Sequence, residues 1–246
     1  MLRNLLNRFG NRKLHERRVF SQNGEDGVIE ELFARLGTSN CFFVEVAAGD
    51  GRECNTLYLA SRGWRGLMIE GNSSLYARLQ SSMKFPGVVT LQKWVTRENV
   101  LGILCEANVQ QEFDLLSIDI DGNDYWIWQE VGLSYKPRVV VIEYNAYYAP
   151  PRRWVMKYKP QHVWDGTTHY GASLSSLADL GNKMGYALIG TESMGVNAFF
   201  IRRELVRISG LKQLSAGEAF HPARYTDPAN PGKYGHPFRD GPHVAI

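Results

Sequence analysis

The sequence predicts an α/β protein with a doubly wound, mostly parallel seven-stranded sheet that carries helices on both faces. Strand and helix patterns alternate five times between residues 41 and 143, which is the order expected of such a sheet. The strand patterns are short and almost continuously apolar, as in parallel strands that are covered on both faces. A later helix pattern and two more strand patterns, within residues 173–203, bring the expected number of strands to seven.

The elements can be assigned in chain order. The first helix pattern, residues 24–37, places Val28, Leu32 and Leu36 on one face and ends at Gly37, a residue type that often follows the last helical turn. The short apolar runs predict strands, which cover residues 41–47, 66–70, 87–92, 113–119 and 138–143. Helices are predicted between them at residues 55–63, 73–81, 97–108 and 123–131. The last helix is predicted at residues 173–185, and the last two strands at residues 186–191 and 197–203.

The length of 246 residues fits one α/β domain with insertions better than two domains. We expect a basic N-terminal arm over residues 1–20, a domain over residues 21–213 and an irregular tail, residues 214–246, packed on that domain. The aromatic- and proline-containing insertion 144–170 is too long for an ordinary connection and is predicted to be a lid. For the arm, two roles stay open, which are contact with an anionic membrane surface and a solvated or oligomer-contacting segment.

Charge and cysteine content limit the classes of function. A net charge of +3 is too small to imply a nucleic-acid partner. The three cysteines, Cys41, Cys54 and Cys105, show no CxxC spacing, which argues against a disulfide framework and against zinc and favours a reducing, cytoplasmic location. No apolar run approaches the roughly 18 residues that a membrane-spanning helix needs. The N-terminus also lacks the continuous apolar region of a signal peptide.

A glycine turn follows the first strand in the stretch FFVEVAAGDGREC. The third glycine of a dinucleotide-binding G-x-G-x-x-G motif is absent, and the Gly-Lys-Ser/Thr of a phosphate-binding Walker loop is absent too. The turn instead follows the pattern acid-x-small-x-Gly-x-Gly, at Glu45, Ala47, Gly49 and Gly51. A plain strand–turn–helix connection without a ligand is the alternative.

A second carboxylate follows at the end of the second strand, where Glu70 lies about 20 residues after the glycine turn. A carboxylate at this place can accept hydrogen bonds from both ribose hydroxyls of an adenosine cofactor. A solvent-exposed strand end would explain Glu70 equally simply, but its spacing from the turn favours the adenosine interpretation.

Further carboxylates gather at the ends of the fourth and fifth strands, at Asp119, Asp121, Asp124 and Glu143, with Asn145 close by in sequence. Because these two strands are expected to be neighbours, Asp119, Glu143 and Asn145 can converge. Three oxygen ligands suit Mg²⁺, Mn²⁺ or Ca²⁺ rather than zinc. The alternatives are a solvated acidic rim and carboxylates that accept hydrogen bonds from loop amides.

Seven segments together carry a resemblance to a known family, and they are FSQNGEDGVI, FFVEVAAGDGRECNTLYL, GLMIEGN, LLSIDIDGNDYWIW, VVVIEYN, WDGTTHYGASL and GVNAFF. Over roughly residues 20–202, the chain resembles the FkbM-like branch of class I S-adenosylmethionine-dependent methyltransferases, including bacterial relatives that modify sugars and surface polysaccharides. The resemblance implies a Rossmann-like fold and transfer of a methyl group to a hydroxyl of a sugar, polysaccharide or related small-molecule acceptor.

The resemblance also implies roles for individual residues. Those expected to contact the cofactor are Gln22 in a covering segment, Glu45, Ala47, Gly49 and Asp50 on the methionine side, Asn55 and Thr56 at its carboxylate, Glu70 at the ribose and Asp119 at the reacting centre. The set Asp119, Glu143 and Asn145 is similar to the metal site of catechol- and sugar-type O-methyltransferases, which implies Mg²⁺ or Mn²⁺. It differs from their pattern because Tyr144 separates the last two residues.

A sugar hydroxyl needs a general base or a metal ion before it can attack a methyl group at neutral pH. The candidate bases are Asp119, Asp121, His162 and His169, of which the last two lie in the predicted lid. The aromatic residues of that lid either stack on the acceptor or pack the lid onto the sheet.

Two other functions are weighed against methyl transfer. One is an NAD-dependent sugar-nucleotide oxidoreductase, which the missing third glycine disfavours. The other is a non-catalytic binding protein on a methyltransferase fold, which the intact carboxylates of Glu70 and Asp119 disfavour. The expected partners are a small-molecule or glycan acceptor and further copies of the same chain.

Overall fold

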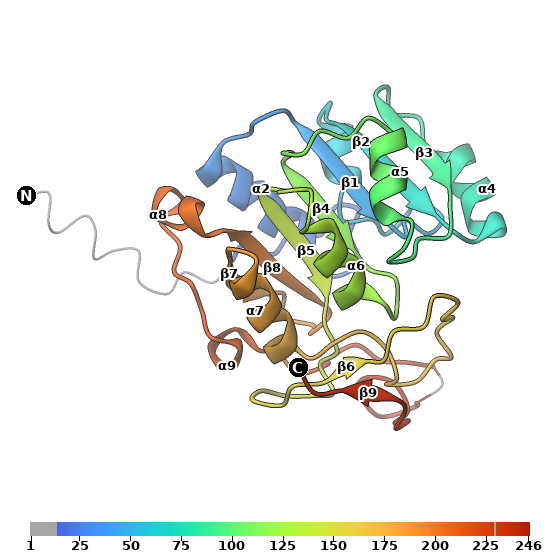
Figure 1. Ribbon diagram of the computed structural model, residues 1–246, viewed down its shortest axis with the longest axis vertical. Helices are drawn as coiled ribbons and strands as arrows, with labels where there is room; N and C mark the ends of the chain where they lie inside the picture. The colour runs from blue at the N-terminus through green and yellow to red at the C-terminus, as the bar shows by residue number, and fades with distance from the viewer. Residues whose placement is uncertain (1–13, 229) are drawn as a thin grey trace, which may run out of the picture.

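The computed structural model describes residues 14–228 and 230–246. Its main sheet has seven strands in the order β3-β2-β1-β4-β5-β8-β7 (Figure 1). Strands β1 to β5 pair in parallel, whereas β8 is antiparallel to both β5 and β7. The strands are β1 (Phe42–Val46), β2 (Arg65–Glu70), β3 (Val88–Gln92), β4 (Leu115–Ile118), β5 (Val139–Glu143), β7 (Tyr186–Thr191) and β8 (Asn197–Arg202). The predicted doubly wound, mostly parallel seven-stranded sheet is therefore confirmed.

Helices cover both faces of this sheet, as predicted. They are α2 (Glu25–Leu36), α3 (Leu57–Ser61), α4 (Ser73–Ser82), α5 (Val100–Glu106), α6 (Asp124–Val131), α7 (Leu174–Lys183), α8 (Val206–Ser209) and α9 (Ala216–Ala219). One apolar core joins α5, α6 and α7 to the sheet, and a second core joins α2, α3 and α4 to the opposite face. Side chains alternate along β1, so Phe43 enters the second core and Val44 the first.

The strand order reverses between β1 and β4, because the chain builds outward from β1 through β2 to β3 and then returns to pair β4 with β1. In a doubly wound sheet the loops diverge at such a point, and ligands bind in the crevice beyond the carboxyl ends of the strands. The register places Val46 beside Ile69 and Ile118, so the segments that follow β1, β2 and β4 leave the sheet at one edge.

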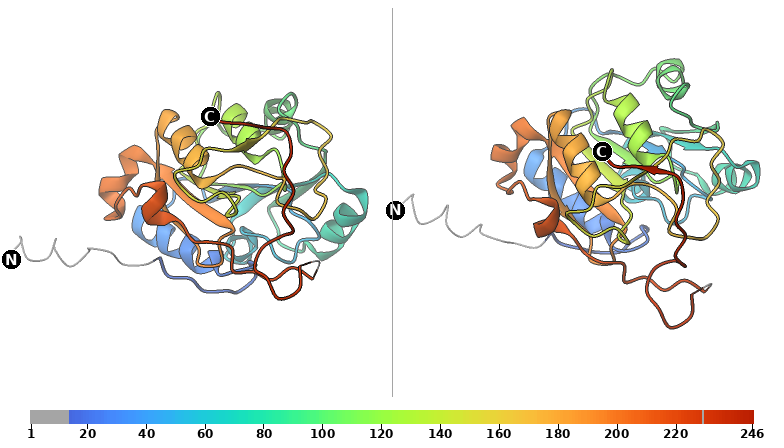
Figure 2. Two further views of the ribbon diagram at one scale, coloured as in Figure 1. Left: turned by 90° about the horizontal axis from the view of Figure 1, so that it is seen from below. Right: turned by 60° about the horizontal axis from the view of Figure 1, so that its bottom comes forward.

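The segment after β5 and the C-terminal tail form a separate layer beyond this edge of the sheet. Strand β6 (Val155–Met156) pairs in antiparallel fashion with β9 (His243–Val244). Two backbone hydrogen bonds extend the contact, from Lys157 to Pro242 at 2.9 Å and from Thr168 to Pro237 at 3.0 Å. Figure 2 shows the red tail crossing the gold segment that follows β5. The tail is thus fastened to the predicted lid.

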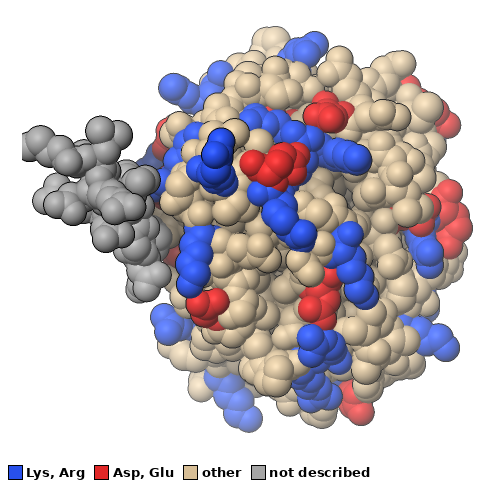
Figure 3. All heavy atoms as spheres, turned by 60° about the vertical axis from the view of Figure 1, so that its left-hand side comes forward, with Lys and Arg blue, Asp and Glu red and all other residues tan. Residues whose placement is uncertain are grey.

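The first thirteen residues of the predicted N-terminal arm lie outside the described residues. The rest of the arm contacts the domain, since Glu16 accepts hydrogen bonds from the Ser193 N–H at 2.9 Å and from its hydroxyl at 2.6 Å. On the face beside α8, basic and acidic side chains are intermixed (Figure 3), with Arg202 paired to Glu112 and Glu204. Within residues 14–228 and 230–246, no helix is long and apolar enough to cross a membrane.

Candidate active site

The glycine turn after β1 adopts a backbone that favours glycine. Ala47, Gly49 and Gly51 have positive φ angles of 63°, 57° and 79°, in the left-handed region. Gly51 is further restricted by packing, because a Cβ atom there would lie 2.8 Å from both Leu79 Cδ1 and Ser82 Oγ of α4. The turn therefore passes close to α4 only because residue 51 has no side chain.

A cavity of about 460 Å³ opens at this turn, and we call it the glycine-turn cavity. Its size falls in the usual range for small-molecule sites, about 300–1,000 Å³. The lining residues are Glu45, Ala47, Ala48, Gly49, Asp50, Arg52, Glu53, Cys54, Asn55 and Asp119. Six of the predicted cofactor residues line it, and they are Glu45, Ala47, Gly49, Asp50, Asn55 and Asp119. The other three, Gln22, Thr56 and Glu70, lie outside the lining.

Glu45 links β1 to the start of α3. Its carboxylate accepts hydrogen bonds from the N–H groups of Asn55 at 2.8 Å and Thr56 at 3.3 Å, and also from the Thr56 hydroxyl. Burial raises the pKa of Glu45 to about 7, against the effect of these donors. Thr56 is fully buried and turns both donors towards Glu45, so in this structure those donors support the cavity wall from behind rather than a ligand.

Glu70 also supports the turn. One of its oxygens accepts the Gly49 N–H at 2.8 Å, and the other accepts the Asn72 N–H at 2.7 Å. A carboxylate offers about four acceptor positions, so Glu70 keeps room for a pair of hydroxyl donors. Its predicted contact with ribose stays a prediction.

The segment that contains Gln22 is held by Asp26 at the start of α2. The Asp26 carboxylate accepts the N–H groups of Val19, Phe20 and Ser21 at 2.8, 2.7 and 2.8 Å. Gln22 itself is exposed, and its side chain accepts a hydrogen bond from the neighbouring Asn23 at 3.4 Å. The structure therefore fixes the segment but does not bring Gln22 into the cavity.

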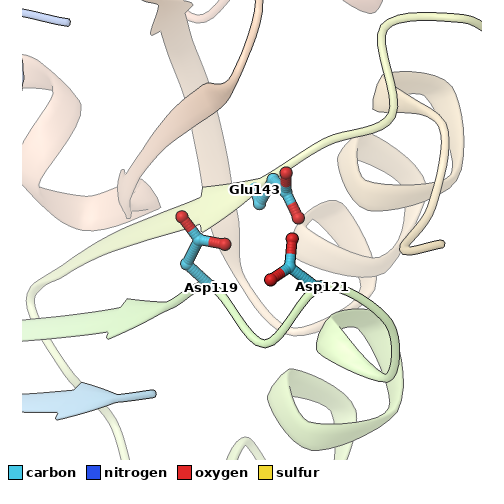
Figure 4. Close-up of side chains that lie close together, drawn as sticks. All are labelled: Asp119, Asp121 and Glu143. Carbon is cyan, nitrogen blue, oxygen red and sulfur yellow. The ribbon is translucent and has the colours of Figure 1, made fainter. Parts of the chain in front are cut away.

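Three carboxylates converge beside the cavity, and we call Asp119, Asp121 and Glu143 the acid cluster. One oxygen from each lies within 4.8 Å of the others. Figure 4 shows the carboxylates of Asp121 and Glu143 facing each other, with Asp119 beside them. Glu143 is only 7% exposed, and no donor in the described part of the chain reaches its Oε2 atom. A buried carboxylate oxygen without a partner costs free energy, so a cation or a ligand hydroxyl that contacts Oε2 would stabilise this arrangement.

The acid cluster has shifted protonation equilibria. Burial, followed by the charges of Asp121 and Asp124, raises the pKa of Asp119 well above its usual range. Burial and the charge of Asp119 do the same for the pKa of Glu143. The pKa of Asp121 rises to about 7, because its carboxyl group is crowded by protein and lies near Asp124, although the residue keeps an exposed edge. Without a cation, these carboxylates cannot all ionise at neutral pH.

Asn145 has a role that was not predicted. Its side-chain N–H₂ group donates to the carbonyls of Thr168 at 2.8 Å and Tyr170 at 2.9 Å, and its side-chain oxygen accepts the Tyr147 N–H at 3.1 Å. The side chain of Asn145 therefore fastens the segment after β5. The predicted metal set of Asp119, Glu143 and Asn145 stays a prediction, while the acid cluster brings Asp121 to the same two carboxylates.

The two histidines of the predicted lid lie in different surroundings. The Nε2 atom of His169 is 3.2 Å from the Pro242 carbonyl of the tail, so this ring holds the lid and tail together. His162 packs on Gly122, where a Cβ atom would lie 2.3 Å from its Cδ2 atom. Burial lowers the pKa of His162, and the charge of His169 lowers it further. His162, rather than the predicted base His169, thus lies against the loop that carries Asp121.

Some residues of the site carried no signal in the sequence. Ser117 accepts a hydrogen bond from the Asn55 side chain at 3.1 Å beneath the cavity. Tyr225 and His236 of the tail contact Tyr170, which follows Glu143 in the predicted lid, and the glycines and prolines of the tail hide any period. A strand-facing serine and a tail aromatic become recognisable only once the strands and the tail are placed.

Comparisons with known proteins found only distant likenesses of structure. No family model matches the chain, and no curated protein matches it. Among solved structures, similar ones include an S-adenosylmethionine-dependent methyltransferase from Clostridium acetobutylicum, with a TM-score of 0.47, 12% identity and coverage of 72% of this chain and 89% of that one. Another from Mesorhizobium loti has a TM-score of 0.44, 14% identity and coverage of 73% and 100%. The N-terminal domain of EvdMO1, crystallised in the presence of SAH and D-fucose, has a TM-score of 0.47, 12% identity and coverage of 82% and 96%.

At identities this low, likeness of structure says nothing about activity. The strand order, with β8 antiparallel to both β5 and β7, confirms the predicted mostly parallel seven-stranded sheet. Any assignment of function depends on the glycine-turn cavity and the acid cluster.

Proposed function

We propose that the protein transfers a methyl group from S-adenosylmethionine to a hydroxyl group of a sugar-type acceptor. The observation that carries the proposal is the position of Asp119, which lines the glycine-turn cavity and also belongs to the acid cluster. A cofactor-sized cavity and a group of proton-accepting carboxylates therefore share one side chain. A cofactor bound in the cavity can present a reactive group to an acceptor held at the cluster.

The charges of the cavity favour this cofactor over a dinucleotide. Its lining includes the carboxylates of Glu45, Asp50, Glu53 and Asp119, against one guanidinium group, Arg52. An acidic wall attracts the sulfonium and ammonium groups of S-adenosylmethionine and repels the pyrophosphate of NAD. The cavity charge thus agrees with the missing third glycine in disfavouring the NAD-dependent oxidoreductase.

Methyl transfer is a displacement at carbon in which the acceptor oxygen attacks in line with the breaking carbon–sulfur bond, so alignment supplies much of the rate. The hydroxyl proton must move to a base as the new bond forms. We propose Asp121 as that base, because its carboxylate belongs to the acid cluster and keeps an exposed edge from which the proton can pass to solvent. Asp119 would face the sulfonium, and the buried Glu143 would orient the acceptor hydroxyl.

We further propose that the acid cluster holds a divalent cation such as Mg²⁺ or Mn²⁺. The unpartnered Oε2 atom of Glu143 supports this, as do three oxygens within 4.8 Å of one another, a donor set that hard cations prefer. A bound divalent ion would lower the pKa of an acceptor hydroxyl. With such an ion in place, Asp119 and Glu143 would remain ionised, and the proton would leave through Asp121 or water.

Calorimetry tests the cofactor. We expect S-adenosylhomocysteine to bind the wild-type protein and NAD to give no heat of binding. Two variants of the cavity wall form a pair. Arg52→Gln, at an exposed residue, should leave the affinity for S-adenosylhomocysteine within a few-fold. Asp50→Lys should weaken this affinity, because it places a cation in the acidic wall. Binding of NAD in preference to S-adenosylhomocysteine would contradict the proposal. Binding without methyl transfer to any hydroxyl acceptor would instead favour the non-catalytic alternative.

A further inference from the structure

A second cavity, of about 240 Å³, lies between the segment after β5 and the tail, and we call it the loop–tail pocket. Asn145, Tyr147, Thr168 and Tyr170 supply one wall, and Ala223, Tyr225, Asn230 and residues 233–238 supply the other. The pocket has about half the volume of the glycine-turn cavity and shares no lining residue with it. It suits a ligand smaller than a nucleoside cofactor.

Exposed aromatic side chains surround the loop–tail pocket. Tyr147, Tyr234 and Phe238 are 50%, 67% and 59% exposed, although large aromatic side chains usually bury most of their surface. The rings of Tyr147 and Phe238 stack with their centroids 5.0 Å apart and their planes inclined by 22°, so they join the segment after β5 to the tail. Exposed aromatic surface that gathers around one cavity marks a binding site.

Two phenol hydroxyl groups line the pocket, beside one cationic side chain, that of Lys233. The hydroxyl groups of Tyr170 and Tyr225 lie 3.2 Å apart, and either one can be the donor. Burial raises the pKa of Tyr225 to about 12 and raises the pKa of Tyr170 well above its usual range, so both rings stay uncharged phenols. Neutral hydroxyl and amide groups beside aromatic faces recognise a ring that carries hydroxyl groups, because such a ring presents both C–H faces and hydrogen-bonding edges.

The pocket also lies close to the acid cluster. Asn145 lines it and follows Glu143 by two residues in the chain. The Asn145 side chain donates to the Tyr170 carbonyl at 2.9 Å, so this wall of the pocket is fastened to the end of β5 two residues after Glu143. Asp119 lines the glycine-turn cavity, and Glu143 precedes a residue of the loop–tail pocket by two positions, so the acid cluster is joined to both cavities.

We propose that the loop–tail pocket binds the methyl acceptor as a saturated, hydroxyl-bearing ring of the sugar type, with the Tyr147–Phe238 pair against one C–H face. The inference rests on the proposed methyltransferase function and adds the place and manner of acceptor binding. It makes the C-terminal tail part of the active site, because Tyr225 and Phe238 come from the tail. One hydroxyl group of the ring would reach the acid cluster past Tyr170.

Saturation-transfer NMR and calorimetry with the methyl glycosides of D-glucose, D-galactose and D-mannose test the inference, in the presence of S-adenosylhomocysteine. At least one glycoside should bind the wild-type protein and receive saturation from aromatic protons. Tyr147→Ala and Phe238→Ala should each weaken that binding at least tenfold, whereas Tyr147→Phe should retain it. Leu133→Ala is the matched control, since Leu133 is 71% exposed and lies outside the pocket lining.

The outcomes separate the inference from the proposed function. Absence of glycoside binding to the wild type, or binding that survives both Tyr147→Ala and Phe238→Ala, overturns the inference. S-Adenosylhomocysteine binding measured on the same samples then shows whether the proposed function still stands. Thermal melting checks that each variant is folded, and if Tyr147→Ala is not, Tyr234→Ala at the same pocket should give the same loss of binding.

Discussion

The glycine-turn cavity is built by strand ends and backbone amides, whereas the loop–tail pocket is built by side chains from distant parts of the chain. In the first, the carboxylates of Glu45 and Glu70 hold the turn through main-chain N–H groups within 2.7–3.3 Å. In the second, Tyr147 reaches Phe238 across 91 residues of sequence by ring stacking. We infer that the first cavity tolerates little change in its backbone, while the second can change its specificity by substitution of exposed rings.

The largest effect is expected where the two regions meet. Asp119→Asn removes a carboxylate that borders both the glycine-turn cavity and the other acids, so methyl transfer should fall by about 10²–10⁴-fold, the usual contribution of positioned proton-transfer groups. The affinity for S-adenosylhomocysteine should change less than tenfold. Steady-state kinetics and calorimetry measure the two quantities. Glu106→Gln is the matched control, because Glu106 is exposed on α5 and lines neither cavity.

An Asp119→Asn variant that keeps full activity would contradict the shared role of this residue. Asp119 would then not link the glycine-turn cavity to the acid cluster in catalysis.

Removal of divalent metal should give the next largest effect. After dialysis against EDTA, activity should fall about a hundredfold, within the range that activation of a hydroxyl group contributes. Added Mg²⁺ or Mn²⁺ should restore it in the wild type. Electron paramagnetic resonance of Mn²⁺ supplies a readout besides activity, and Glu143→Gln should weaken the bound signal. Full activity in EDTA, with no bound Mn²⁺ signal, would leave the acid cluster as a set of simple bases.

The sequence was sufficient to predict the strands of the sheet and the carboxylates at their ends. Apolar runs revealed each strand of the sheet, and parallel register then placed Glu45, Glu70, Asp119 and Glu143 at one edge without knowledge of any contact. The carboxylates at strand ends could therefore be predicted, because the period of a strand fixes where its last side chain lies.

The contacts of side chains in the irregular segments could not be predicted in this way. Asn145 was expected to join a metal site, and no pattern indicated that its N–H₂ group also donates to Thr168 and Tyr170, which are 23 and 25 residues away. Gln22 and His169 were likewise assigned to a ligand, whereas one is exposed and the other contacts Pro242. Such partners depend on how a loop folds back, and no sequence period records that path.

Glu70→Gln should have a smaller effect that is confined to the cofactor side. Glutamine keeps one acceptor oxygen for the turn but loses the charge and one of the two acceptor oxygens, so the affinity for S-adenosylhomocysteine should fall about 10- to 100-fold, as expected for hydrogen bonds to a charged group. Glycoside binding in the loop–tail pocket should be unchanged. Calorimetry with both ligands distinguishes the cases, and equal affinity of the variant and wild type for S-adenosylhomocysteine would remove Glu70 from the cofactor site.

The smallest expected effect is on stability, and it arises from Glu45 beneath the glycine turn. The pKa of Glu45 is raised by burial from 4.5 to about 7. Between these pH values the folded chain holds a proton on Glu45 that the unfolded chain has lost, so unfolding releases a proton and the free energy of unfolding falls as pH rises. The stabilisation is complete below about pH 4.5 and is lost as the pH passes 7.

Glu45→Gln isolates the pH dependence, because glutamine cannot titrate, although it keeps only one of the two oxygens that accept from Asn55 and Thr56. The melting temperature of the wild type should fall more steeply between pH 5 and pH 8 than that of the variant, where each kcal/mol corresponds to about 2–4 °C for a chain of this size. Melting curves across this range in one ionic strength measure the difference. Parallel curves for both proteins would show that Glu45 ionises in the folded chain as easily as in the unfolded one. The wall of the glycine-turn cavity would then be held by a carboxylate that is charged throughout, and the contrast with the uncharged phenols of the loop–tail pocket would become sharper.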